Sequence, residues 1–274
     1  MNTLGIIGGG NMAESLIAGL LASGHKASAI QVSEPDINRR EYLSTEYGIH
    51  CLDNNSVLAG QSDILLFAVK PQLLRQVAEP LKQVVQAKHP LIISIVAGVR
   101  SSDLDRWLGG GLAIVRVMPN TPALVRAGAS GLYANHLVNS LQRDLAESIL
   151  RSVGITVWLE NEAQMDIVTA LSGSGPAYIF RVIEAMEEVA TRAGLERETS
   201  RLLAIETVLG AARLAMESDD TPAELRCKVT SPSGTTEKGL QQLELGNIEQ
   251  LFDNAINAAI DRSREMGDEL GADS

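Results

Sequence analysis

Short apolar runs alternate with amphipathic segments along the first 160 residues of the chain. The apolar runs predict β-strands at residues 4–7, 29–32, 64–69, 91–96, 113–117 and 155–159. The runs near residues 64 and 91 have almost no polar positions, as expected for a parallel sheet covered on both faces. Amphipathic segments with helical spacing lie between most of them, at residues 12–23, 73–86, 102–108 and 141–152. This alternation predicts an α/β protein with a doubly wound sheet.

The pattern changes near residue 160, after which helical periodicity predominates. Long helices are predicted at residues 176–194, 198–218 and 247–267, with Gly194 ending the first and Asn247 capping the start of the last. The middle helix is apolar around much of its circumference and therefore has to be buried. We expect residues 1–160 to form the α/β domain and residues 161–274 an all-α domain that packs against another subunit.

Composition narrows the functional classes. The chain has 274 residues, 45% of them hydrophobic, and no apolar run near the roughly 20 residues that span a membrane. Its formal charge of −11 and 3% aromatic content argue against a nucleic-acid partner. Cys51 and Cys227 form no CxxC pair, and no metal site is expected. These features favour a cytoplasmic protein.

Three consecutive glycines separate the first predicted strand from the first predicted helix. Gly8, Gly10 and Ala13 fit the G-x-G-x-x-G/A pattern, with Asn11 and Met12 opening the helix. In this setting, Gly8 makes the turn, Gly10 admits a pyrophosphate, and the helix N-terminus offers free N–H groups to the phosphates. We interpret the segment as a dinucleotide site; the alternative is a plain glycine turn.

The end of the second strand, VSEPDINRR, bears on the identity of the coenzyme. Glu34 could accept hydrogen bonds from an unphosphorylated ribose, which favours NAD. Ser33, Arg39 and Arg40 could instead hold the 2′-phosphate of NADP. Chemistry alone leaves the two alternatives even, and the arginines could also lie on a solvated helix face.

Four further stretches carry a family resemblance. They are AVKP at 68–71, VRVMPNTPALVRAG at 115–128, ALSGSGPAY at 170–178 and VTSPSGTTEKGL at 229–240. In this order and at these separations the chain resembles pyrroline-5-carboxylate reductases over essentially its whole length. The resemblance implies a Rossmann domain and a helical dimerisation domain, forming a homodimer or a ring of dimers. It implies reduction of a cyclic imine carboxylate to proline by NAD(P)H, with NADPH preferred.

The resemblance also implies a substrate site. Ser231, Gly234, Thr235 and Thr236 match the positions that hold the substrate carboxylate, where hydroxyls and N–H groups at a helix start can cradle an anion. Thr236 further matches the catalytic hydroxyl near the imine nitrogen; we interpret it as a hydrogen-bond donor or proton relay. Glu162 matches an acidic position close to the substrate. The alternatives are a threonine helix cap and an exposed carboxylate at a helix start.

Coenzyme contacts are expected at the carboxyl ends of the strands, where doubly wound sheets bind ligands. Besides Gly8, Gly10, Asn11, Met12, Ser33 and Arg39, the expected contacts are Asn55, Ala68, Val69, Lys70, Pro71, Ala97, Gly98, Met118 and Asn120. Asn54 competes with Asn55 for one position. Gly173 and Gly175 could face the substrate or permit close packing.

Two other functions share this architecture. A β-hydroxyacid dehydrogenase would place a catalytic lysine on the first long helix of the second domain, and residues 176–194 contain none. A non-catalytic NADP-sensing protein would have no reason to keep Ser231 and Thr236.

Overall fold

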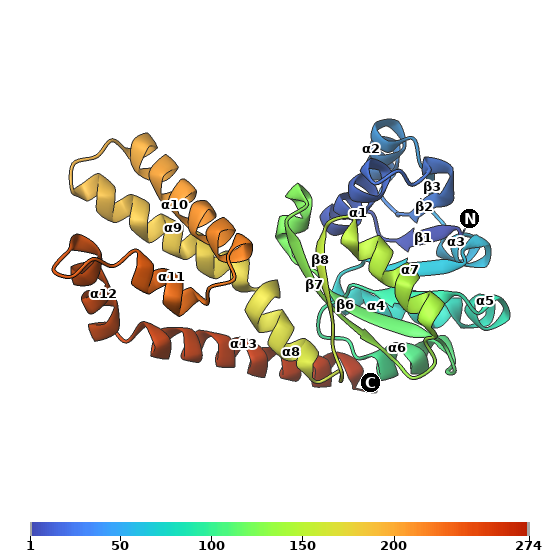
Figure 1. Cartoon of the computed structure of the whole chain (residues 1–274). Helices are drawn as coiled ribbons and strands as arrows, with labels where there is room; N and C mark the ends of the chain where they lie inside the picture. The colour runs from blue at the N-terminus through green and yellow to red at the C-terminus, as the bar shows by residue number, and fades with distance from the viewer. Residues whose placement is uncertain (1, 273–274) are drawn as a thin grey trace. The chain divides into compact units, whose positions relative to one another are not determined.

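The computed structural model of the chain describes residues 2–272, which divide into two compact units. The first, called here the Rossmann unit, runs to Ser174 and includes the chain from Ala258 onward. The second, the helical unit, is Gly175–Asn257. Figure 1 shows the elements of each unit.

An eight-stranded sheet forms the centre of the Rossmann unit, in the order β3-β2-β1-β4-β5-β6-β7-β8. Neighbouring strands are parallel except β6 and β7, which are antiparallel. The strands are β1 (Leu4–Ile7), β2 (Ile30–Ser33), β3 (His50–Leu52), β4 (Ile64–Phe67), β5 (Leu91–Ser94), β6 (Ile114–Met118), β7 (Gly128–Ala134) and β8 (Gly154–Trp158). The predicted doubly wound sheet is confirmed.

Helices cover both faces of the sheet and bury two separate cores. They are α1 (Asn11–Ala22), α2 (Ile37–Tyr47), α3 (Asn55–Gln61), α4 (Pro71–Ala78), α5 (Lys82–Lys88), α6 (Ser101–Leu108), α7 (Ser140–Arg151) and α8 (Gln164–Val168). Leu16 of α1 and Ile149 of α7 belong to one core, whereas Leu74 of α4 and Leu104 of α6 belong to the other. Two buried faces explain why β4 and β5 are apolar at nearly every position.

The local predictions hold for the strong elements and fail for the weak ones. All six predicted strands are present, with ends displaced by at most two residues. The predicted helix at 73–86 is instead α4 and α5 joined by a 3-10 turn at Glu79–Leu81, which contains Pro80. The sequence pattern missed β3, which has three residues, and β7, whose sequence GASGLYA is rich in small residues. It also missed α2 and α3.

The helical unit consists of α9 (Gly175–Arg192), α10 (Arg197–Glu217), α11 (Pro222–Lys228), α12 (Thr235–Leu245) and the first part of α13 (Ile248–Gly271). Gly194 follows α9 with φ of 111°, as expected for a glycine that ends a helix. Asn247 precedes α13 with φ of 53°, a left-handed turn conformation. No residue of α9, α11 or α12 is buried within the single chain, and in α10 only Ser200 and Ala204 are.

The last part of α13 belongs to the Rossmann unit. Ser263 donates a hydrogen bond to Asp166 of α8 (2.7 Å), and Arg100 forms an ion pair with Asp268 (2.5 Å). The sequence pattern draws one boundary after residue 160. In the structure, residues 161–174 instead pack with the Rossmann unit, and the chain from Ala258 onward belongs to that unit as well.

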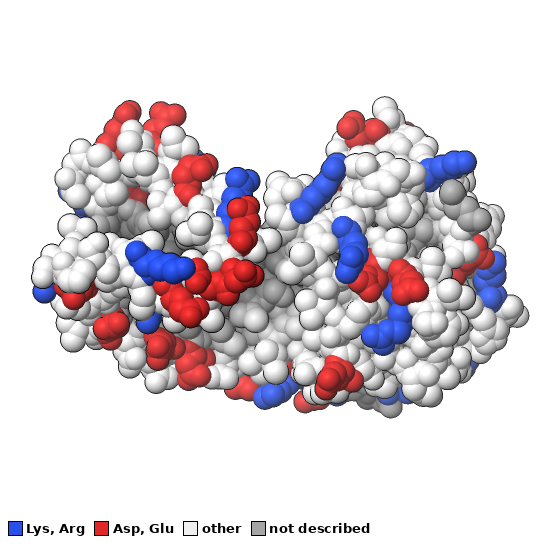
Figure 2. Space-filling view, viewed as in Figure 1, with Lys and Arg blue, Asp and Glu red and all other residues white. Residues whose placement is uncertain are grey.

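Within residues 2–272, no helix combines the length and apolar character that crossing a membrane requires. Charged side chains on the face shown in Figure 2 are separated by broad uncharged areas over the helical unit. The exposed apolar side chains of the helical unit include Phe180, Val189, Leu202, Leu209 and Leu214, each at least 40% exposed.

Candidate functional site

The three glycines after β1 have different surroundings, which differ in how well they would accept a side chain. Gly8 has φ of 97°, and a Cβ placed there would lie 2.6 Å from the Ala68 carbonyl oxygen. A Cβ on Gly9 would lie 2.8 Å from Cδ1 of Leu43 on α2. A Cβ on Gly10 would meet no atom within 4 Å. The fold therefore requires glycine at position 8, the Leu43 side chain packs closely on Gly9, and Gly10 borders open space.

That open space belongs to a cavity of about 370 Å³ at the carboxyl ends of β1, β2 and β4. It is lined by seven predicted coenzyme residues, namely Gly8, Gly10, Ser33, Asn55, Ala68, Val69 and Lys70. A second cavity of about 450 Å³ shares Asp53, Asn55, Leu73 and Val77 with it. Together the two cavities form a groove at the sheet edge where doubly wound folds bind nucleotides. We call it the nucleotide groove.

The N-terminus of α1 meets this groove. Gly10 is the N-cap residue, and no side chain within the described residues caps this helix start. The first N–H groups of a helix lack backbone partners and carry a partial positive charge, so they suit a pyrophosphate. Lys70 is exposed at the groove, immediately before α4, and supplies a cation. A dinucleotide therefore fits the residues present.

Ser33 and Asn55 lie together on the wall of the groove. The Ser33 hydroxyl donates to Oδ1 of Asn55 at 2.6 Å. Asn54 instead caps α3, because its Oδ1 accepts hydrogen bonds from the N–H groups of Ser56 and Val57. The two asparagines thus have separate roles, which the sequence left unresolved.

Glu34 and the two arginines form a turn beside the groove. Glu34 accepts hydrogen bonds from the N–H groups of Gly9 (2.8 Å) and Asp36 (3.1 Å). Arg40 donates to the carbonyl oxygens of Glu34 and Pro35, at 2.7 and 2.8 Å. Arg39 donates to the Gly9 carbonyl oxygen and pairs with Glu14. Both guanidinium groups therefore have partners within the protein.

The remaining predicted coenzyme residues lie outside the lining of the groove cavities. These residues are Asn11, Met12, Arg39, Pro71, Ala97, Gly98, Met118 and Asn120. Gly98 faces α13, since a Cβ there would lie 3.2 Å from Cβ of Met266. Asn120 is buried; it accepts from the Ala129 N–H and donates to the Ser172 carbonyl oxygen. It thereby ties the MPNTP loop to β7 and to the segment after α8.

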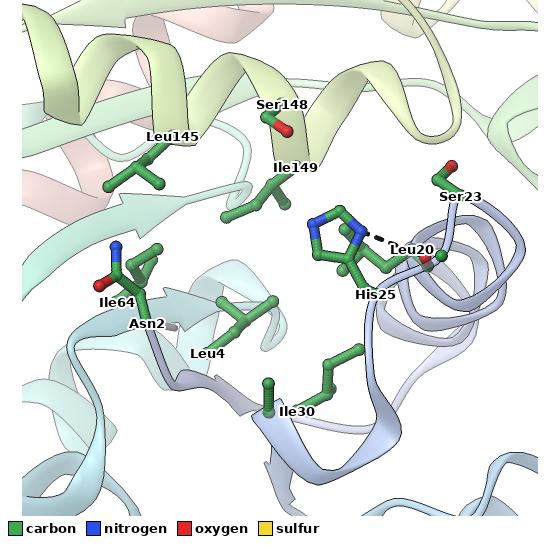
Figure 3. A pocket seen from close by; sticks show the side chains of 12 residues that line it. Asn2, Leu4, Leu20, Ser23, His25, Ile30, Ile64, Leu145, Ser148 and Ile149 are labelled. Atoms are coloured by element: carbon green, nitrogen blue, oxygen red, sulfur yellow. Dashed lines mark hydrogen bonds between the residues drawn. The ribbon is translucent and has the colours of Figure 1, made fainter.

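A different cavity, of about 310 Å³, opens at the amino ends of β1, β2 and β4, opposite the carboxyl ends that border the nucleotide groove (Figure 3). Leu4, Ile30 and Ile64 contribute apolar walls there, and Nδ1 of His25 lies 3.2 Å from the Leu20 carbonyl oxygen. Among the residues that the structure describes, no lysine or arginine lines this cavity to hold a phosphate. The nucleotide groove is therefore the candidate coenzyme site.

In the helical unit, the predicted substrate residues surround the start of α12. Gly234 is the N-cap residue, Thr235 and Thr236 are the first residues of the helix, and a turn joins the Gly234 N–H to the Ser231 carbonyl oxygen at 3.0 Å. No side chain of the described residues caps this helix. The proposed threonine cap therefore does not form, because glycine occupies the cap position. The exposed Ser231, Thr235 and Thr236 hydroxyls and the free N–H groups lie together at this helix start, an arrangement that can hold an anion; we call it the cradle.

Glu162 is fixed inside the Rossmann unit. One oxygen accepts from the Ser101 N–H and the other from the Ser101 hydroxyl, both at 2.6 Å. Arg116, itself 6% exposed, forms an ion pair with Glu162 at 3.1 Å. The carboxylate thus holds the start of α6 and neutralises a buried arginine, a setting that neither sequence alternative anticipated.

Groove residues that sequence reasoning missed include Asp53, Leu73 and Val77. Asp53 follows β3, and recognising that short strand would have placed Asp53 at the carboxyl edge of the sheet. Leu73 and Val77 are four residues apart on α4, and this spacing is the signal that both face the groove.

Two family models match successive parts of the chain. Residues 3–98 match the family model described as NADP oxidoreductase, coenzyme F420-dependent. Residues 162–266 match the model described as pyrroline-5-carboxylate reductase dimerisation. A pyrroline-5-carboxylate reductase from Pseudomonas aeruginosa is 44% identical over 268 residues, covering 98% of each chain.

Solved structures agree with these matches. A pyrroline-5-carboxylate reductase from Coxiella burnetii has a TM-score of 0.93 at 43% identity, covering 97% of this chain and 98% of that one. The Plasmodium falciparum pyrroline carboxylate reductase with NADP bound has a TM-score of 0.86 at 32% identity, with the same coverage. The similarity thus extends over both units.

Proposed function

Because the chain belongs to the pyrroline-5-carboxylate reductase family, we propose that it reduces Δ1-pyrroline-5-carboxylate to L-proline with NAD(P)H. The observation that carries this proposal is the uncapped helix start at Gly234, with the exposed hydroxyls of Ser231 and Thr236 beside it. A protein of net charge −11 repels anions as a whole, so a carboxylate needs a local site of this kind. The second supporting feature is the nucleotide groove.

The two sites supply the two requirements of the reaction. The bound coenzyme provides a hydride to carbon 5 of the ring. The cradle at α12 holds the carboxylate, and the Thr236 hydroxyl donates a hydrogen bond toward the imine nitrogen. A threonine hydroxyl is too weak an acid to protonate the nitrogen by itself, so it orients the ring or relays a proton. Most of the rate therefore comes from positioning.

Glu162 is proposed to act on the substrate only through its charge. Its oxygens are occupied by Ser101 and Arg116, so its contribution to stabilising a protonated iminium is partly cancelled by the buried guanidinium.

We propose NADPH as the preferred coenzyme. Ser33 lines the groove, and Arg40 holds the turn of Glu34 and Pro35 that borders it. A 2′-phosphate can compete for Arg40 because its present partners are neutral carbonyl oxygens. Glu34 opposes this preference, so NADH also serves. Replacing Arg40 with alanine is expected to raise the KM for NADPH more than that for NADH.

The helical unit is proposed to complete its core in a homodimer, and the dimers to assemble further into a ring. The support is the match of residues 162–266 to a dimerisation family and the exposed apolar surface of α9 and α10. Light scattering at micromolar concentration tests this; a folded, active monomer would contradict it.

One assay separates the proposed reaction from the alternatives. NAD(P)H oxidation is followed with pyrroline-5-carboxylate, with the six-membered cyclic imine, with β-hydroxyacids in the reverse direction, and without substrate. We expect rapid turnover with the five-membered imine. Turnover of hydroxyacids alone would indicate a β-hydroxyacid dehydrogenase, although α9 contains no lysine. Coenzyme binding without any turnover would indicate a sensor.

A further inference from the structure

A cluster of four polar side chains joins α1 to α2 behind the glycine loop. Glu14, in the first turn of α1, accepts hydrogen bonds on Oε1 from the hydroxyls of Tyr42 (2.8 Å) and Tyr47 (2.9 Å). Its Oε2 pairs with Arg39 at 2.5 Å. The Arg39 guanidinium also lies 5.1 Å from the centre of the Tyr42 ring. The Arg39 and Glu14 side chains are 25% and 19% exposed, whereas Tyr42 covers the pair from the solvent side and is 44% exposed.

Glu14 poses an electrostatic problem for a coenzyme site. It lies within one turn of the helix start that faces the groove, where a carboxylate repels a pyrophosphate. Burial raises the pKa of Glu14, but hydrogen bonds from Arg39, Tyr42 and Tyr47 outweigh it and lower the pKa overall. The carboxylate therefore stays charged, and Arg39 is the cation that offsets it.

Arg39 also determines the shape of the loop. While one nitrogen pairs with Glu14, Nε donates to the Gly9 carbonyl oxygen at 2.6 Å. The backbone N–H of Gly9 in turn donates to the Glu34 carboxylate at 2.8 Å. Both polar groups of Gly9 are thus held from outside the loop, and a Cβ on Gly9 would lie 2.8 Å from Cδ1 of Leu43 on α2.

From this geometry we propose that Arg39 is a positioning residue for both NADH and NADPH. It holds the Gly9 carbonyl and screens Glu14 from the pyrophosphate, and it does not read the 2′-phosphate. The Arg39 guanidinium binds a carboxylate and a carbonyl oxygen together, so moving it toward a 2′-phosphate would break an ion pair and a hydrogen bond. Arg40 binds only neutral oxygens. The proposal rests on the proposed coenzyme site.

The test is a titration of NADH and NADPH into the wild-type protein and its variants, followed by nicotinamide fluorescence. Arg39→Ala is expected to weaken binding of both coenzymes by about tenfold or more, with the ratio of the two affinities changed less than about threefold. Arg40→Ala is expected to weaken NADPH alone. Arg151→Ala removes a similar arginine–glutamate pair on α7 and serves as the control.

A second substitution isolates the electrostatic part. In Arg39→Ala the Glu14 charge is uncovered, so adding Glu14→Gln should recover about threefold or more of the lost affinity for both coenzymes. A residue that only contacted the 2′-phosphate would show no such rescue. If Arg39→Ala does not fold, Arg39→Gln serves instead, because glutamine removes the charge that screens Glu14 and keeps a hydrogen-bond donor for the Gly9 carbonyl oxygen.

Each outcome decides the proposal. Equal losses for both coenzymes, with rescue by Glu14→Gln, support it. A loss confined to NADPH, equal losses without rescue, or unchanged affinities in Arg39→Ala would overturn it. Failure of the wild-type protein to bind either coenzyme would instead refute the proposed function, so the two failures are distinguishable.

Discussion

The Rossmann unit and the helical unit differ in how far one chain completes them. The sheet of the Rossmann unit is covered by helices on both faces, and residues such as Leu16, Phe67 and Leu104 are buried within the single chain. In the helical unit Ala204 is the buried hydrophobic residue, while Phe180, Leu202 and other large apolar side chains are exposed. An apolar surface of this size is stable in water only when another surface covers it. The Rossmann unit is therefore complete within one chain, whereas the helical unit exposes the apolar surface that the proposed dimer would cover.

The difference extends to function. In the Rossmann unit the nucleotide groove is built from residues that the fold already holds, such as Ser33 and Asn55. In the helical unit the cradle lies at the start of α12, and the exposed hydroxyls of Ser231, Thr235 and Thr236 have no partners among the described residues. Coenzyme binding should thus depend on one chain, and substrate reduction on the assembled protein.

The largest effect is expected when charge is introduced into the exposed apolar surface of the helical unit. Leu202 and Leu209 are seven residues apart on one face of α10 and are 61% and 40% exposed in the single chain. Replacing both with aspartate should weaken dimerisation at least about a thousandfold, roughly 4 kcal/mol, because unpaired charges would be buried in the interface. Sedimentation velocity measures the change, and activity should fall with it.

Leu141 provides the matched control, because it is 73% exposed but lies on α7 of the Rossmann unit. Leu141→Asp should leave the oligomer unchanged. A double α10 variant that remains dimeric and active would show that this surface is not the interface.

The glycine loop separates stability from binding within the Rossmann unit. Gly8→Ala should lower the free energy of unfolding by roughly 2–4 kcal/mol, because φ is positive and the methyl group meets the Ala68 carbonyl oxygen. Gly10→Ala should leave thermal unfolding nearly unchanged, since its Cβ enters open space, yet weaken coenzyme binding about tenfold. Differential scanning calorimetry and coenzyme titration measure the two effects. Equal destabilisation by both substitutions would refute this division.

Substitutions at the cradle test whether the exposed helix start serves chemistry. Thr236→Ala should reduce kcat/KM by about 10–150-fold, or about 1.5–3 kcal/mol, through loss of one hydrogen bond in the transition state. Thr236→Ser should recover much of this. Ser231→Ala should mainly raise the KM for substrate, because its contact is the same before and during reduction.

Binding of NADPH alone should be nearly unchanged in these three variants. If Thr236→Ala keeps full activity, the placement of the substrate at α12 is wrong.

The smallest expected effect concerns the choice between NADPH and NADH, which should depend on residues of the Rossmann unit alone. Glu34→Gln removes a negative charge from the groove while its amide oxygen can still accept from the Gly9 N–H. Affinity for NADPH relative to NADH should rise about three- to tenfold, or about 0.7–1.4 kcal/mol. Asp36→Asn removes a nearby charge that caps α2 and should leave the ratio unchanged. An unchanged ratio in Glu34→Gln would show that this carboxylate does not influence the 2′-phosphate.

The sequence by itself determined the elements whose signals are local. Uninterrupted apolar runs located β4 and β5, and a glycine pattern located the loop between β1 and α1. The family resemblance, carried by four motifs, was confirmed over the whole chain. These features depend on residues close together in the chain, so periodicity and spacing reveal them.

Only the tertiary structure decided features that depend on residues far apart. Gly9 is explained by Leu43 and Arg39 on another helix, and the roles of Asn54 and Asn55 by which one faces Ser33. β7 has little apolar character of its own and is specified by pairing with β6 and β8. The end of α13 joins the Rossmann unit through Asp166 and Arg100. Contacts of this kind arise when distant segments pack, and no local pattern records which segments will meet.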